Sequence, residues 1–338
     1  MCSRQLLPLF VMSVVAVSAF AQTPPGQPTS GPGGSDYPHK SVTALGPYYP
    51  AGRTGDNNFR YFIYQPSSPK PQSAPVILFL HGYGANYPEI YRPWMTHIAK
   101  KGFTVVWVQY DRGFSSGRNF GTNAAESYRD ALEKMENDTS GTFVRPARNA
   151  SNEILTGITG HSNGGYLSLV LAAMATQSGS RIPVPKVLVP VMAGQASSAT
   201  GPFQNIPPET KVVFLVGEQD SLACKGTTSA LWRAIPQVPD SNKEFLVLRS
   251  DTYGNPDLVA DHFVPVSRAD TLDYYGVWKL SVAAFQCAFY GKECTTALGN
   301  GADQQVGMGQ WSDGTPVKPM QWAASPSDVQ LPCEIGSR

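Results

Sequence analysis

The chain has 338 residues, of which 41% are hydrophobic, so it is long and apolar enough to bury a large core. Its 26 basic and 25 acidic residues leave a formal net charge of +1. Nucleic-acid binding needs a concentrated basic face, and this balance excludes nucleic acid as the partner. The five histidines, at positions 39, 81, 97, 161 and 262, are too scattered for a zinc motif, and we expect no metal.

The first 21 residues have the pattern of a signal peptide. One basic residue, Arg4, precedes an apolar stretch from Leu6 to Phe20, and Ala19-Phe20-Ala21 is a small-residue cleavage site. A membrane anchor is disfavoured because no basic stop-transfer cluster follows. We therefore expect a secreted or periplasmic protein with no integral membrane segment after cleavage.

Residues 22–44 consist largely of Pro, Gly, Ser and Thr. Such a composition buries too little apolar surface to offset its ordering entropy, so we expect a flexible leader. Residues 45–338 then form a single domain, because α/β folds often exceed the usual size of one domain.

Strand-like and helix-like segments alternate along this domain. The pattern predicts an α/β fold with a mostly parallel central sheet and helices on both faces. Two helices are expected: an amphipathic one over 124–136, capped by Thr122 or Asn123, and an apolar, central one over 165–175. The predicted strands are Arg60–Tyr64, Val76–Leu80, Thr104–Tyr110, Ile154–Thr159, Lys186–Val191, Val212–Val216 and Phe245–Leu248.

Two segments match Gly-x-Ser-x-Gly, a pattern that holds a nucleophilic serine on a sharp turn between strand and helix. The segment 113–117, with Ser115, is followed by a polar loop. The segment 160–164, with Ser162, follows a predicted strand and opens directly into the apolar helix. This context favours Ser162 as the nucleophile.

The loop His81-Gly82-Tyr83-Gly84 follows the predicted strand 76–80. In folds built on such a serine turn, this loop and the residue after the nucleophile donate backbone N–H groups to the oxyanion. The expected donors are Tyr83 and Asn163, with His81 shaping the loop.

The chain order of this serine arrangement is nucleophile, acid, base. His262 is the one histidine after Ser162 and is therefore the expected base. Asp220, just beyond the strand 212–216, is favoured as the acid over the neighbouring Glu218. Asp261 is the third candidate, because its side chain is badly placed to reach the ring of the adjacent histidine.

Four cysteines remain after Cys2 leaves with the signal peptide. An even number in an exported chain indicates two disulfides, and four cysteines allow three connectivities. Cys287 and Cys294 are near in sequence, which favours their pairing and leaves Cys224 for Cys333.

Taken in order, the motifs at 81–84, 160–165, 217–220 and 261–263 resemble those of α/β-hydrolases over about residues 45–320. Within that superfamily the chain is similar to secreted esterases related to cutinases and polyester hydrolases, to chlorophyllases and to platelet-activating-factor acetylhydrolases. The resemblance implies hydrolysis of small to medium acyl, lipid or polyester substrates through an acyl-enzyme, without a cofactor.

The chain departs from the cutinase-like pattern at two positions. Asn163 replaces the usual Met after the nucleophile, and Asp261 replaces a small residue before the base. Both departures put polymer hydrolysis in doubt. Three aromatic residues, Tyr83, Tyr87 and Phe114, are candidates to line the substrate pocket. An amidase or peptidase, and a non-catalytic binding protein, stay open as alternatives.

Overall fold

The computed structural model describes residues 22–111, 119–196, 200–266 and 268–335. Within these ranges one nine-stranded sheet has the order β1-β2-β5-β4-β7-β8-β9-β10-β11, and β3 pairs with β6 separately. The six strands from β5 to β10 in this order are parallel, whereas the edge strands pair antiparallel. The strands are β1 (Ser41–Tyr48), β2 (Tyr61–Ser67), β3 (Ser73–Ala74), β4 (Val76–Leu80), β5 (Thr104–Val108), β6 (Arg145–Pro146), β7 (Thr156–His161), β8 (Val187–Val191), β9 (Lys211–Gly217), β10 (Lys243–Leu248) and β11 (Gln321–Ala323).

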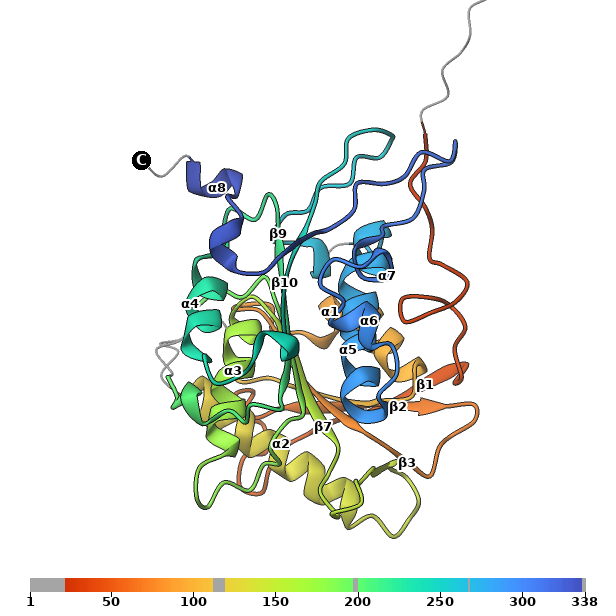
Figure 1. Ribbon diagram of the computed structural model, residues 1–338. Helices are drawn as coiled ribbons and strands as arrows, with labels where there is room; N and C mark the ends of the chain where they lie inside the picture. Colours follow the sequence, from red (N-terminus) through yellow and green to blue (C-terminus); the bar gives the residue numbers. More distant parts are fainter. Residues whose placement is uncertain (1–21, 112–118, 197–199, 267, 336–338) are drawn as a thin grey trace, which may run out of the picture.

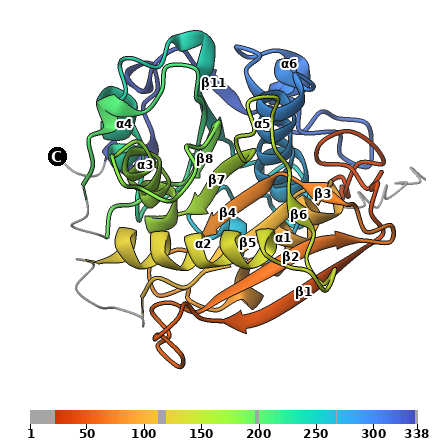
Figure 2. The ribbon, with the colours of Figure 1, turned by 90° about the horizontal axis from the view of Figure 1, so that it is seen from below.

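Helices cover both faces of the sheet (Figure 1 and Figure 2). Helices α2, α3 and α4 contribute to the apolar core on one face, and α1 and α5 contribute to the core on the other. The predicted mostly parallel α/β architecture is confirmed. The helices are α1 (Pro88–Lys100), α2 (Phe120–Glu136), α3 (Asn163–Ala175), α4 (Gly226–Ala234), α5 (Trp278–Tyr290), α6 (Cys294–Ala297), α7 (Asp303–Val306) and α8 (Pro332–Ile335), and one π-helical turn, Asp273–Val277, precedes α5.

The central strands are continuous buried runs. Every side chain of β4, β5 and β8 is buried, as expected for parallel strands with helices on both faces. All seven predicted strands are present, as β2, β4, β5 and β7 to β10. The unpredicted strands are β1 and β11, which lie at the edges of the sheet, and the two-residue β3 and β6.

Helix α2 begins earlier than predicted. Its first residue is Phe120 and its N-cap is Asn119, not Thr122 or Asn123. The Phe120 ring is buried and lies 5.1 Å from the ring of Tyr110, so tertiary packing draws the first turn into the helix. Helix α3 is buried nearly all round, as its apolar sequence predicts.

Residues 22–44 differ from the expected flexible leader, because they pack against the domain. The Nζ of Lys101 donates to Asp36 at 2.5 Å, and the Nε2 of His97 lies 2.8 Å from the carbonyl oxygen of Pro32. Residues 41–44 already belong to β1. Hydrogen bonds and ion pairs to partners tens of residues away hold a segment that has little apolar surface of its own.

Two disulfides join Cys287 to Cys294 and Cys224 to Cys333, the connectivity that the sequence favoured. None of the helices among the described residues is both long enough and apolar enough to cross a membrane. The predicted signal peptide, 1–21, lies outside the described residues.

Candidate active site

Ser162 lies on the sharp turn between β7 and α3. Its backbone has φ 55° and ψ −123°, a strained conformation for a residue with a side chain. A Cβ on Gly164 would lie 2.0 Å from the carbonyl oxygen of Leu80, and one on Gly160 would lie 2.6 Å from the Gly164 backbone. Both glycines of the motif are therefore required by close backbone approach.

The structure brings the three predicted triad side chains together. The Nε2 of His262 lies 2.9 Å from the Oγ of Ser162, and its Nδ1 lies 2.8 Å from Oδ2 of Asp220. Asp220 is fully buried, His262 is 6% exposed, and Ser162 is partly exposed. A carboxylate can only accept, so Nδ1 carries the proton and Nε2 is left to accept from the serine hydroxyl.

Asp220 is held by its own loop. Its Oδ1 accepts hydrogen bonds from the backbone N–H groups of Leu222 at 3.0 Å and Ala223 at 2.8 Å. Oδ2 is thereby directed at the imidazole. The loops of Asp220 and His262 follow β9 and β10, which are adjacent parallel strands, so both side chains reach the same edge of the sheet as Ser162.

The competing candidates face elsewhere. Glu218 accepts from the backbone N–H of Ser250 and lies 3.7 Å from the guanidinium of Arg249. Asp261 accepts from the backbone N–H of Phe263, two residues along its own loop. Neither carboxylate is bonded to His262 among the contacts described, and Ser115 lies outside the described residues.

The predicted oxyanion donors flank Ser162. Asn163 is the first residue of α3, and the N–H groups of a first helical turn have no acceptor within the helix. Gly82, which precedes Tyr83, would place a Cβ 3.3 Å from the Cβ of Ser162. The loop 82–83 therefore passes directly beside Ser162, as the predicted oxyanion role requires.

The Asn163 side chain is buried and joins two parts of the site. Its Nδ2 donates to the hydroxyl of Tyr110 at 3.1 Å, and its Oδ1 accepts from the backbone N–H of Ala196 at 3.0 Å. The Tyr110 hydroxyl donates in turn to the carbonyl of His81 at 2.5 Å, and the His81 and Tyr110 rings stack at 4.1 Å. Burial lowers the pKa of His81 to about 4, so the ring is neutral, in keeping with a loop-shaping role.

Two buried residues beside the site had no predicted role. Tyr91, on α1, and His161, the last residue of β7, are hydrogen-bonded to each other at 2.9 Å. Tyr91 also accepts from the backbone N–H of Gly82, and His161 lies within hydrogen-bond distance of the backbone carbonyl of His262. Adjacency to the nucleophile was the one sequence signal for His161, and Tyr91 has none, because its partners are distant along the chain.

A cavity of about 360 Å³ opens over Ser162. Two apolar side chains, Leu222 at 66% exposed and Phe263 at 51% exposed, stand at its rim. Tyr83 lines the cavity as predicted, whereas Tyr87, 60% exposed at the N-cap of α1, lines a separate hollow. The turn into α1 directs Tyr87 to solvent, so it does not line the cavity over Ser162. Phe114 lies outside the described residues.

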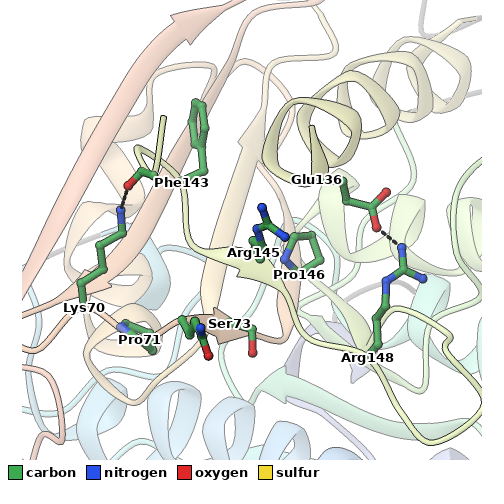
Figure 3. Close-up of a pocket in the computed structure, with 10 residues that line it drawn as sticks. Lys70, Pro71, Ser73, Glu136, Phe143, Arg145, Pro146 and Arg148 are labelled. Atoms are coloured by element: carbon green, nitrogen blue, oxygen red, sulfur yellow. Dashed lines mark hydrogen bonds and ion pairs between the residues drawn. The ribbon is translucent and has the colours of Figure 1, made fainter. Parts of the chain in front are cut away.

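A larger cavity, of about 880 Å³, lies away from this chemistry (Figure 3). It is formed around β3 and β6, which lie near the N-terminal ends of β4 and β7, opposite to the edge that carries Ser162. Lys70 donates to backbone carbonyls there, and Arg148 pairs with Glu136. The larger cavity volume does not make this the reactive site. Its charged side chains Lys70, Arg148 and Glu136 are already paired, and the predicted triad lies at the other cavity.

Comparison with known proteins places this geometry in a family context. Residues 61–194 match the chlorophyllase family, which is of the α/β-hydrolase type. A search of curated proteins finds no match. The matched range includes the loop 81–84 and Ser162, and Asp220 and His262 follow it in the chain. The mostly parallel sheet flanked by helices is consistent with the α/β-hydrolase fold of the chlorophyllase family, which the chain matches over residues 61–194.

Proposed function

We propose that the chain is a serine hydrolase that cleaves carboxylic esters, with Ser162 as the nucleophile, His262 as the base and Asp220 as the acid. One observation carries the proposal. His262 lies within hydrogen-bond distance of Ser162 through Nε2 and of a fully buried carboxylate through Nδ1. The match to the chlorophyllase family supports an esterase at the family level.

Acylation follows from this geometry. The Oγ of Ser162 attacks the ester carbonyl carbon while Nε2 of His262 takes the hydroxyl proton. The carbonyl oxygen becomes negative and accepts hydrogen bonds from the backbone N–H groups of Tyr83 and Asn163. The bond to the alcohol oxygen then breaks, the alcohol leaves with the proton from His262, and the acyl group stays on Ser162.

Deacylation repeats the same steps with water. His262 takes a proton from water, the hydroxide oxygen attacks the acyl carbon, and Ser162 leaves with that proton to regenerate its hydroxyl. Asp220 accepts from Nδ1 and stabilises the imidazolium that forms twice in each cycle. No cofactor is needed for either half-reaction.

The cavity supports an ester with apolar groups. Its volume, about 360 Å³, is at the lower end of small-molecule sites, which suits a small to medium acyl group. The exposed rim residues Leu222 and Phe263 offer apolar contact to a longer chain, a lipid or a polyester that extends beyond the cavity.

We further propose that the protein is exported to an oxidising compartment, with residues 1–21 removed and residues 45–338 forming one domain onto which 22–44 pack. The two disulfides support an extracellular or periplasmic location. N-terminal sequencing of the exported protein tests the cleavage after Ala21.

The function is tested with p-nitrophenyl esters of increasing acyl length, on the mature protein and on Ser162→Ala. We expect turnover by the wild type and a fall in kcat of about 10⁴-fold or more in the variant, because the nucleophile is lost while binding remains. Ser115→Ala, at the second Gly-x-Ser-x-Gly segment, is the matched control and should keep wild-type activity.

Circular dichroism must show that both variants are folded. Ester turnover that survives in folded Ser162→Ala, or that is lost in Ser115→Ala instead, contradicts the assignment of the nucleophile. A folded wild type that hydrolyses amides but none of the esters contradicts the assignment of the substrate.

A further inference from the structure

A buried chain of hydrogen bonds connects the oxyanion loop to the base loop behind the nucleophile. The backbone N–H of Gly82 donates to the Tyr91 hydroxyl at 2.8 Å, and this hydroxyl lies 2.9 Å from Nδ1 of His161. The Nε2 of His161 lies 2.8 Å from the backbone carbonyl oxygen of His262. Tyr91 is fully buried and His161 is 3% exposed.

The donor and acceptor of each hydrogen bond follow from the carbonyl oxygen at one end of this chain. A carbonyl oxygen can only accept, so Nε2 of His161 carries the proton and donates to His262. Nδ1 is then an acceptor and takes the hydroxyl proton of Tyr91, whose oxygen accepts from Gly82. Each donor in the chain therefore has one acceptor, with a single pattern of protons.

His161 keeps this pattern because it stays neutral. Burial first, and the nearby His262 second, lower its pKa to about 3. The two imidazole rings are 4.7 Å apart. When His262 becomes positively charged during the reaction, a neutral neighbour does not repel it.

We propose that Tyr91 and His161 are positioning residues that fix the oxyanion loop relative to the base, on either side of Ser162. The proposal rests on the esterase function proposed above. Both ends of the chain are backbone atoms, one at Gly82, which precedes the donor Tyr83, and one at His262 itself. Small displacements of these backbone groups should slow the reaction, because the reacting groups must be aligned to within about 1 Å.

The same bonding pattern occurs a second time in the molecule, away from the triad. The Tyr37 hydroxyl lies 2.9 Å from Nδ1 of His97, whose Nε2 lies 2.8 Å from the carbonyl oxygen of Pro32. Burial also lowers the pKa of His97 to about 3. This pair holds the N-terminal segment against α1. A substitution of Tyr37 therefore shows the effect of losing a buried Tyr–His hydrogen bond without disturbing the site at Ser162.

The test compares Tyr91→Phe with Tyr37→Phe in steady-state ester hydrolysis. We expect kcat to fall about tenfold or more in Tyr91→Phe, with KM within about twofold of wild type, because alignment is lost and the substrate pocket is kept. Tyr37→Phe should keep kcat within about twofold. Equal kcat in the two variants, or a change confined to KM in Tyr91→Phe, overturns the proposal.

His161 is tested by two substitutions that differ in hydrogen bonding. His161→Gln keeps an N–H donor that can reach the carbonyl of His262, and His161→Leu has none. We expect His161→Gln to retain several-fold more kcat than His161→Leu, whereas equal kcat in the two folded variants contradicts a positioning role. If His161→Leu does not fold, the Tyr91→Phe comparison alone decides.

The two proposals fail in different ways. An inactive wild type, or activity that survives in Ser162→Ala, overturns the esterase function and this inference with it. An active wild type with a normal Tyr91→Phe variant overturns the positioning role alone.

Discussion

Cys224 is bonded to Cys333, which lies 109 residues further along the chain and only four residues after Val329. The next residue, Lys225, donates through Nζ to the backbone carbonyls of Pro326 and Val329, and it pairs with Glu334 at 3.2 Å. Because Asp220 precedes Cys224 by four residues, the C-terminal segment is attached directly to the loop that carries the predicted catalytic acid.

Removing this disulfide should impair both stability and activity. For the double variant Cys224→Ser/Cys333→Ser we expect a loss of roughly 4 kcal/mol in the free energy of unfolding, because the closed loop is long. We also expect a severalfold fall in kcat, since the Asp220 loop loses its attachment. Urea unfolding and ester kinetics measure the two effects.

The second disulfide provides the matched control. Cys287 and Cys294 are seven residues apart, at the end of α5 and the start of α6, and neither lines the cavity over Ser162. Cys287→Ser/Cys294→Ser should lose roughly 2 kcal/mol of stability and keep wild-type kcat. If both double variants keep the same kcat, the link between the C-terminal segment and the acid has no role in catalysis.

Asp220→Asn tests which carboxylate is the acid. The amide oxygen can still accept from the Leu222 and Ala223 N–H groups, so the loop should stay folded. An amide NH₂ facing Nδ1 favours the wrong imidazole tautomer, and we expect kcat to fall by about 10⁴-fold. The control Glu218→Gln should stay within a few fold of wild type; a larger loss there than in Asp220→Asn would reassign the acid.

The central strands and the triad candidates could be predicted because their physical signals lie within short stretches of the sequence. A buried parallel strand is an apolar run, such as Val76–Leu80, and the two glycines around Ser162 reflect backbone crowding that any such turn shares. His262 followed from chain order alone, because no other histidine comes after the serine.

What sequence reasoning missed depends on contacts between distant residues. The bond between Tyr91 and His161 spans 70 residues, and the packing of 22–44 rests on partners such as Lys101. Nothing in the local pattern of either segment encodes these partners. The direction of the Tyr87 side chain was also inaccessible, because it depends on how the oxyanion loop turns into α1.

Acid should destabilise the fold through its buried histidines. Burial lowers the pKa of His81 to about 4 and those of His97 and His161 to about 3, whereas histidine in the unfolded chain titrates near 6.5. Between these values the unfolded state binds more protons, so stability falls as the pH falls below about 6.5. Each histidine should cost about 2 kcal/mol between pH 7 and pH 5.

This pH dependence is measured by urea unfolding at pH 7 and pH 5, for wild type and His97→Gln. Glutamine keeps a donor for the carbonyl of Pro32 but does not titrate. The variant should therefore lose about 2 kcal/mol less than wild type between the two pH values. An equal loss in both proteins would mean that His97 is already protonated, or not buried, in the folded state.

The side chain of Asn163 accounts for a polar residue after the nucleophile, where the cutinase-like pattern has Met. Asn163→Met keeps the backbone N–H at the expected oxyanion site but removes the side-chain hydrogen bonds to the Ala196 N–H and to the Tyr110 hydroxyl. We expect a loss of about 1–3 kcal/mol in stability, because two hydrogen bonds are lost and each contributes roughly 0.5–1.5 kcal/mol. A fall in kcat should accompany it, because Tyr110 also holds the carbonyl of His81 at the start of the oxyanion loop.

The variant Tyr110→Phe removes the hydroxyl that accepts from the Asn163 side chain. If the Asn163 network acts as one unit, the double variant should lose less kcat than the product of the two single losses. Independent losses that multiply would instead mean that the two residues contact the site separately.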